Sequence, residues 1–136
     1  MKRRSYLKTI LAAGAGLTAA SAQTATPKGQ GKTPIILYVD MQVDPAKEQE
    51  LIKNFHTIFK PEAVKHPGYI DVTIAKLRSA LMGTAPAGMN YRFQLTYQSE
   101  ELRQKWIASP EHAKVWPTIE NTLTSKNYTV LLCDVV

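Results

Sequence analysis

The chain has 136 residues, a formal net charge of +6 at neutral pH and one cysteine, Cys133, which excludes an intramolecular disulfide and any zinc site built from several cysteines. Four of the 17 basic residues lie within the first eight positions and no acid precedes Asp40, so the rest of the chain carries 13 bases against 11 acids. This near balance, with no basic stripe interleaved with aromatics, argues against nucleic-acid binding, and we expect no nucleic-acid partner.

The N-terminal segment has the three parts of an export leader. The pair Arg3-Arg4 precedes an uncharged run of mainly Ala, Leu, Ile and Gly over residues 9–20, and Ala20-Ser21-Ala22 has small residues where a signal peptidase reads them. The uncharged run rises only about 18 Å as a helix, which is too short to span a membrane. We therefore expect a signal peptide over residues 1–22, with an uncleaved lipid tether as the alternative.

The stretch RRSYLK, residues 3–8, closely resembles the twin-arginine export signal, with Tyr6 where phenylalanine is commoner. The resemblance implies that the folded protein crosses a bacterial membrane and works in the periplasm or another extracytoplasmic space. Contact with the membrane is then limited to export. Residues 23–33, rich in Thr, Gly, Lys and Gln, are typical of a flexible linker.

The first predicted strand covers residues 35–43, in which apolar residues alternate with a second, partly polar set in the period-two pattern of a strand. Asp44 as a cap and Pro45 in the first turn predict that a helix follows. Pro61 should kink or end that helix. The apolar side of the helix is expected to consist of Leu51, Ile52, Phe55, Ile58 and Phe59.

Two further strands are predicted in the middle of the chain. The turn His66-Pro67-Gly68 leads into residues 69–77, where Ile70, Val72 and Ile74 alternate with polar or small residues. A loop rich in Gly, Ala and Pro then leads into residues 89–98, the clearest strand. Its apolar set is Met89, Tyr91, Phe93, Leu95 and Tyr97.

The C-terminal part is expected to contain two helices and a last strand. Ser99 is a cap for a short helix through Trp106, and Ser109-Pro110 begins a second helix through about Leu123. Residues 128–136 form the last strand. This order predicts one α+β domain over residues 34–136, a ferredoxin-like antiparallel sheet with helices on one face.

One face of the predicted sheet is polar, and two interpretations remain open. In the first, this face lies in water, as antiparallel sheets allow. In the second, it pairs with the sheet of a second copy and forms a dimeric barrel with a semi-polar interior. The polar set consists of Tyr38, Asp40, Asp71, Thr73, Asn90, Arg92 and Gln94.

Residues 34–136 resemble the antibiotic biosynthesis monooxygenase family of dimeric α+β barrel proteins. The resemblance depends on the order of the elements, on the turn His66-Pro67-Gly68-Tyr69, on the junction YQSEELRQKW and on SPEHAKVW at the start of the last helix. It implies a homodimer with a cavity between sheet and helices. It also implies oxygenation of aromatic compounds, often without a metal or flavin, because the substrate itself supplies the electrons to oxygen.

His112 is the candidate catalytic residue. It shares one helix face with apolar residues at spacings of three, four, seven and eleven, and an imidazole in such a stripe is suited to act as a pocket base. The alternative is a packed, hydrogen-bonded structural histidine near the helix start. The apolar residues on this face are Val115, Trp116, Ile119 and Leu123.

The candidate substrate-binding residues are Trp106, Trp116, Arg92 and Tyr38. An indole offers a broad apolar face and one donor for an aromatic ligand, although such tryptophans are more often core residues. We expect no metal site, because three scattered histidines lack the spacing of metal ligands.

We also expect no cofactor. The haem-degrading branch of the resembled family has an asparagine on the first strand and a histidine partway along the last helix. Residues 35–43 contain no asparagine, and Trp116 stands where that histidine would fall, one turn after His112. These departures disfavour haem oxygenation and leave haem binding open.

Together these features predict an exported, homodimeric, cofactor-independent monooxygenase that acts on a small aromatic or quinone-like compound. The rival hypothesis is a periplasmic binding or interaction module of the same fold without chemistry. An open pocket around His112 would favour the enzyme, and a sealed apolar space would favour the module.

Overall fold

The computed structural model describes residues 33–136, and Pro34–Val136 form one compact unit. The predicted signal peptide, residues 1–22, and the linker up to residue 32 lie outside the described residues. Among the described residues, no helix is long and apolar enough to cross a membrane.

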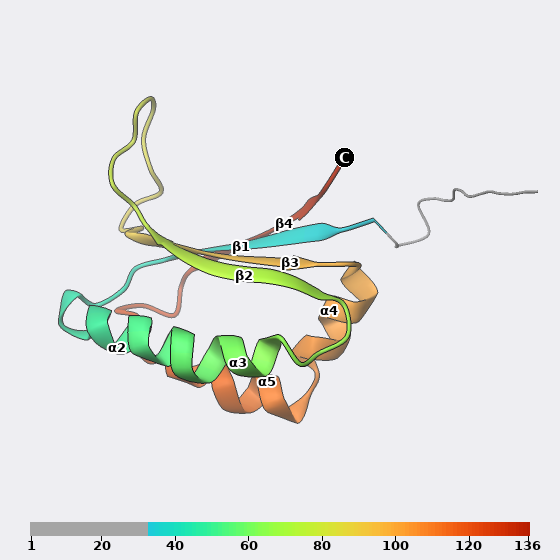
Figure 1. The fold of residues 1–136 in the computed structure, drawn as a ribbon. Coiled ribbons are helices and arrows are strands. Elements are labelled where there is room, and N and C mark those ends of the chain that lie inside the picture. Colours follow the sequence, from blue (N-terminus) through green and yellow to red (C-terminus); the bar gives the residue numbers. More distant parts are fainter. Residues whose placement is uncertain (1–32) are drawn as a thin grey trace, which may run out of the picture. The chain divides into compact units, whose positions relative to one another are not determined.

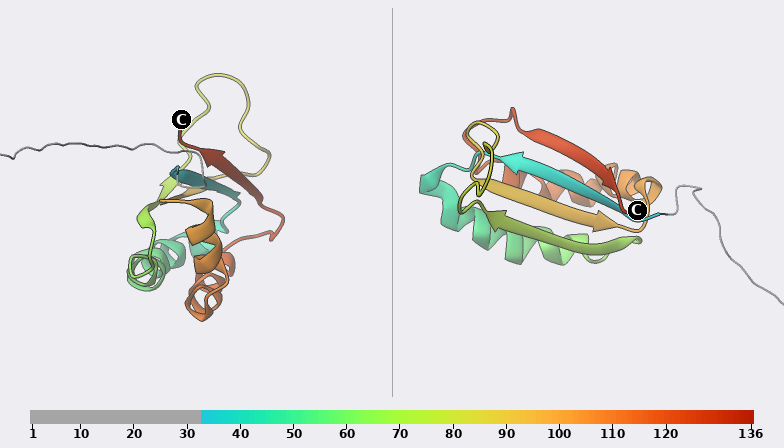
Figure 2. Two further views of the ribbon diagram at one scale, coloured as in Figure 1. Left: turned by 90° about the vertical axis from the view of Figure 1, so that its right-hand side faces the viewer. Right: turned by 90° about the horizontal axis from the view of Figure 1, so that it is seen from above.

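The fold is an antiparallel sheet with helices on one face, which confirms the predicted ferredoxin-like α+β class (Figure 1). The strands are β1 Ile35–Met41, β2 Tyr69–Lys76, β3 Tyr91–Tyr97 and β4 Thr129–Asp134, in the order β2-β3-β1-β4. The helical elements are η3 Pro45–Lys47, α2 Glu48–Asn54, η4 Phe55–Phe59, α3 Lys60–Ala63, α4 Glu100–Ile107, α5 Pro110–Val115 and α6 Pro117–Glu120. Figure 2 shows the helices beneath one face and the opposite face left uncovered.

The core lies between the helices and the apolar face of the sheet. β3 alternates as predicted: its odd-numbered residues are buried and its even-numbered residues are half-buried on the other face. Phe59 contacts Phe93 and Trp106 edge to face, with ring centroids 5.4 and 5.9 Å apart. Such contacts fix the orientation of the rings as well as burying apolar area.

The helix after β1 begins as predicted, since Asp44 Oδ1 accepts a hydrogen bond from the backbone N–H of Ala46. The predicted apolar side is partly wrong, because Ile58 is exposed. Pro61 has no N–H to donate to the carbonyl group of Thr57, and the backbone just before it is wound as the π-helical turn η4. A wider turn keeps residues four apart on one side of the helix. The buried set is therefore Leu51, Phe55, Phe59 and Ala63.

The prediction for β2 is also partly wrong, because Ile70 is exposed. The pairing of β2 with β3 shifts register between Tyr69 and Asp71, and this bulge turns Ile70 away from the core. Tyr69 packs against the core instead, while Val72 is fully buried as predicted.

The C-terminal helices are capped as predicted. Ser99 Oγ accepts from the N–H of Leu102, and Ser109 Oγ accepts from the N–H of His112. The single second helix predicted through Leu123 is divided, because Pro117 cannot donate to the turn before it. The last helix α6 accordingly ends at Glu120, short of Leu123.

The uncovered sheet face carries one charged pair. Asp40 and Arg92 are cross-strand partners, and Arg92 donates from Nε and Nη2 to the two carboxylate oxygens of Asp40 at 2.6 and 3.0 Å. The guanidinium also lies 5.0 Å from the centre of the Tyr38 ring. Asn90 does not point across this face, because its side chain bonds the backbone N–H and carbonyl group of Val43.

Candidate functional site

A cavity of about 170 Å³ lies between the sheet and helices α4 and α5. Its walls are mainly apolar, and the β4 side is accessible to solvent, since Val130 is 51% exposed. The helices do not cover this edge strand. The lining residues are Leu37, Val39, Phe59, Phe93, Leu95, Arg103, Trp106, Ile107, His112, Trp116, Tyr128 and Val130.

His112 is half-buried in the cavity wall, on the first turn of α5. Burial lowers the pKa of His112, and electrostatic interactions with Arg103 and His66 lower it further. The lowered pKa favours the neutral form of the imidazole. No hydrogen bond among residues 33–136 engages either ring nitrogen, and neither nitrogen is sealed from solvent. The side chain can thus accept a proton from a molecule in the cavity.

The two tryptophans flank His112. The Trp106 ring meets the imidazole edge to face with centroids 5.0 Å apart, and the Trp116 ring lies nearly parallel to it at 6.1 Å. Both indoles line the cavity. The structure therefore brings three of the five predicted site residues together.

Trp116 is held by a second pair of side chains that the sequence analysis did not identify. Its Nε1–H donates to Tyr128 Oη at 3.3 Å, and Tyr128 Oη donates to Glu120 Oε2 at 2.7 Å. Burial, together with this bond to Glu120, raises the pKa of Tyr128. These bonds fix the indole that lies against His112.

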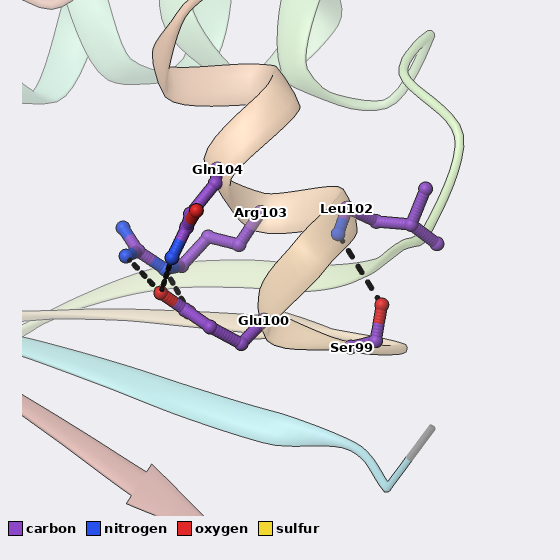
Figure 3. Close-up of polar contacts among 5 residues, drawn as sticks. All are labelled: Ser99, Glu100, Leu102, Arg103 and Gln104. Carbon is purple, nitrogen blue, oxygen red and sulfur yellow. Dashed lines mark hydrogen bonds and ion pairs between the residues drawn. The ribbon is translucent and has the colours of Figure 1, made fainter. Parts of the chain in front are cut away.

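Arg103 is a further cavity residue that the sequence analysis missed. It projects from α4, and its Nε and Nη2 donate to the two carboxylate oxygens of Glu100 at 2.6 and 2.7 Å (Figure 3). The same hydrogen bonds lower the pKa of Glu100. In the sequence, the i,i+3 spacing of Glu100 and Arg103 predicts an ion pair on one side of a helix. Spacing alone does not show that the pair borders a cavity.

Arg92 and Tyr38 do not line this cavity. They lie on the even-numbered face of β3 and β1, opposite the helices, and contact each other there. The structure thus separates them from the histidine and the two tryptophans.

The other histidines do not line this cavity. His56 is exposed on the π-helical turn η4, whereas His66 packs against the Trp106 ring at 4.5 Å and has Nε2 3.9 Å from Glu111 Oε1. Within residues 33–136, no group of three His, Cys, Asp or Glu side chains is arranged to hold a metal ion.

No protein-family model and no curated protein matches the sequence. Solved structures share the fold. A protein from Caulobacter crescentus provisionally named an antibiotic biosynthesis monooxygenase is 17% identical, with 78% of this chain and 92% of that chain covered and a TM-score of 0.61. A dimeric ferredoxin-like protein of unknown function from Jannaschia sp. CCS1 is 12% identical over 76% of this chain and 98% of that chain, with a TM-score of 0.60.

A hydroxynitrile lyase from Passiflora edulis is 10% identical, with 77% of this chain and 95% of that chain covered and a TM-score of 0.63. At these identities the likeness shows the fold alone. Because one fold can carry unrelated chemistries, the activity of this chain has to be argued from its own cavity.

Proposed function

We propose that the chain is a monooxygenase that oxygenates a small aromatic substrate, a phenol or hydroquinone, without a cofactor of its own. The observation that carries the proposal is the state of His112. It borders an apolar cavity accessible from the β4 side, its ring nitrogens have no protein partner among the described residues, and burial lowers its pKa, which favours the neutral imidazole. A ring nitrogen without a protein partner is available to accept a proton from a molecule in the cavity.

The size and walls of the cavity suit one aromatic ring. An engineered apolar cavity of about 150 Å³ holds benzene, and the cavity beside His112 measures about 170 Å³. Trp106 and Trp116 offer indole faces and edges to such a ring. The site therefore favours a small substrate over an extended fused-ring system.

The chemistry needs only a base and exclusion of water. His112 takes the proton from a ring hydroxyl, and the resulting anion transfers electrons to O₂. One oxygen atom forms a new C–O bond with the ring. The other leaves as water with two hydrogens of the substrate, so a hydroquinone becomes a hydroxyquinone. The ring supplies all four electrons.

The functional unit we propose is an exported homodimer. The uncovered sheet face combines the Asp40–Arg92 pair with the exposed Leu131, which faces the same side as its cross-strand partner Tyr38. Pairing with a second copy would cover this mixed surface, and the related fold from Jannaschia is described as dimeric. Export by the twin-arginine route would deliver the folded protein.

Oxygen consumption tests the proposed activity. The purified mature protein is mixed with phenols and hydroquinones under isotopically labelled O₂, with heat-denatured protein as the control for autoxidation. We expect oxygen uptake above autoxidation and one labelled atom in the organic product. Binding of these compounds without any enzymatic oxygen uptake would contradict the proposal and support the binding-module hypothesis.

A further inference from the structure

Among residues 33–136, Arg103 is the only permanently charged residue that lines the cavity. Its side chain is only 16% exposed, although a surface ion pair on a helix needs no such burial. A guanidinium beside a mainly apolar cavity loses much of its hydration, so an anionic partner there is worth more than in water.

The guanidinium is held in one orientation with donors to spare. Glu100 occupies Nε–H and one N–H of Nη2, and Gln104 Nε2 donates to the same carboxylate at 2.9 Å (Figure 3). An arginine has five N–H donors in a fixed planar fork. None of the hydrogen bonds among residues 33–136 uses Nη1, and Nη1 is not sealed from solvent. Two donors on Nη1 and one on Nη2 remain for a ligand.

The position of Arg103 relative to His112 adds a second constraint. The two side chains line the same cavity and are close enough for the charge of Arg103 to lower the pKa of His112. A cavity ligand near the histidine therefore meets the free N–H groups of Arg103, whose positive charge Glu100 partly offsets, and no carboxylate group among the lining residues. A neutral ring would satisfy the apolar walls but would make no use of these donors, whereas a carboxylate group accepts from them.

We infer that the ligand of this cavity is a single aromatic ring with a carboxylate substituent, and that the carboxylate binds the free N–H groups of Arg103. The inference rests on the proposed function, because that proposal places the substrate in the cavity beside His112. It narrows the substrate class from phenols and hydroquinones to hydroxybenzoates, with the carboxylate on Arg103 and a ring hydroxyl directed to His112.

Equilibrium binding tests the inference without requiring turnover. Benzoate and benzamide have the same shape and differ in charge at pH 7, and neither is a hydroquinone. The chain has two tryptophans, and both line the cavity, so intrinsic fluorescence reports its occupancy. We expect benzoate to bind the wild-type protein about tenfold or more tightly than benzamide, the difference typical of a charge-assisted hydrogen bond.

Two variants assign the preference to Arg103. Arg103→Gln removes the charge and should bring the two affinities together, whereas Arg78→Gln removes an arginine from an exposed position outside the cavity and should preserve the preference. Circular dichroism checks the fold of both variants. Arg103→Lys, which keeps the charge but not the fork, should retain only part of the preference.

Equal affinity of the wild-type protein for benzoate and benzamide would overturn the inference, as would failure of both to bind. A preference that survives in Arg103→Gln would also overturn it. Oxygenation of uncharged hydroquinones in the absence of benzoate selectivity would support the proposed function and contradict only the inference that the ligand carries a carboxylate. Selective benzoate binding without oxygenation of any hydroxybenzoate would support the binding of a carboxylate to Arg103 and contradict the proposed oxygenation.

Discussion

Replacing Gly68 with alanine tests how the turn before β2 positions α4, the helix that carries Arg103 and Trp106. Gly68 has φ +93°, and a methyl group there would lie 2.7 Å from both Cβ and Cδ1 of Leu102. Because Leu102 Cβ is attached to the α4 backbone, the helix has to move. Strain at positive φ costs about 1–2 kcal/mol, and overpacking costs about 1–3 kcal/mol. We expect the free energy of unfolding to fall by about 2–5 kcal/mol.

Gly83→Ala is the matched control for this substitution. Gly83 also has a positive φ, +74°, but an added methyl group would meet no atom within 4 Å. It should therefore cost only the backbone strain, about 1–2 kcal/mol. Urea denaturation followed by tryptophan fluorescence measures both variants. Equal losses in the free energy of unfolding for Gly68→Ala and Gly83→Ala would refute the predicted clash with Leu102.

Four further results are expected. Oxygen uptake should rise with pH through a pKa below 6.5 and then level off, because burial lowers the pKa of His112 and only the neutral imidazole accepts a proton. The free energy of unfolding should fall as pH drops below about 6.5, since the unfolded chain then binds the proton more readily than the folded protein. His112→Gln should weaken the pH dependence of oxygen uptake and of the free energy of unfolding. If neither quantity depends on pH in this way, the lowered pKa of His112 is contradicted. Light scattering should give a dimer for the wild-type protein and a folded monomer for Leu131→Glu, whereas a dimeric variant would show that the uncovered face is not the interface. Conversion of Arg3 and Arg4 to lysine should retain the precursor in the cytoplasm, and normal export of that variant would rule out the twin-arginine route.

The strands were predictable because their signal is local. In β3 each residue alternates between the core and the opposite face, so burial follows directly from sequence parity. Ile70 breaks this rule in β2, because a one-residue shift against β3 reverses which side chains face the core. The sequence of β2 alone does not contain that pairing.

The helix after β1 shows a similar limit. An ideal helical wheel puts Ile58 beside Phe55 and Phe59, but the π-helical turn before Pro61 changes the angle between successive residues. The capping residues Ser99 and Ser109 were predictable, since their hydroxyl groups act on the N–H three residues later.

The candidate site was predictable in part. His112 and Trp116 share a helix face through their spacing, and the same parity that made β3 recognisable placed Arg92 on the face away from the helices. The place of Arg103 in the cavity wall depends on how α4 packs over β3. That wall combines residues distant in the sequence, which no local pattern specifies.

The most direct test of the central claim compares turnover and stability in His112→Ala and in His56→Ala, a histidine exposed outside the cavity. Oxygen uptake with a hydroquinone or hydroxybenzoate and the free energy of unfolding are measured on the same preparations. If His112 is the base, its replacement lowers turnover by about 100-fold or more, the range for loss of a general base, and leaves the protein folded. His56→Ala should retain full turnover. Full turnover in His112→Ala, together with a lower free energy of unfolding, would contradict the account and make His112 a structural residue.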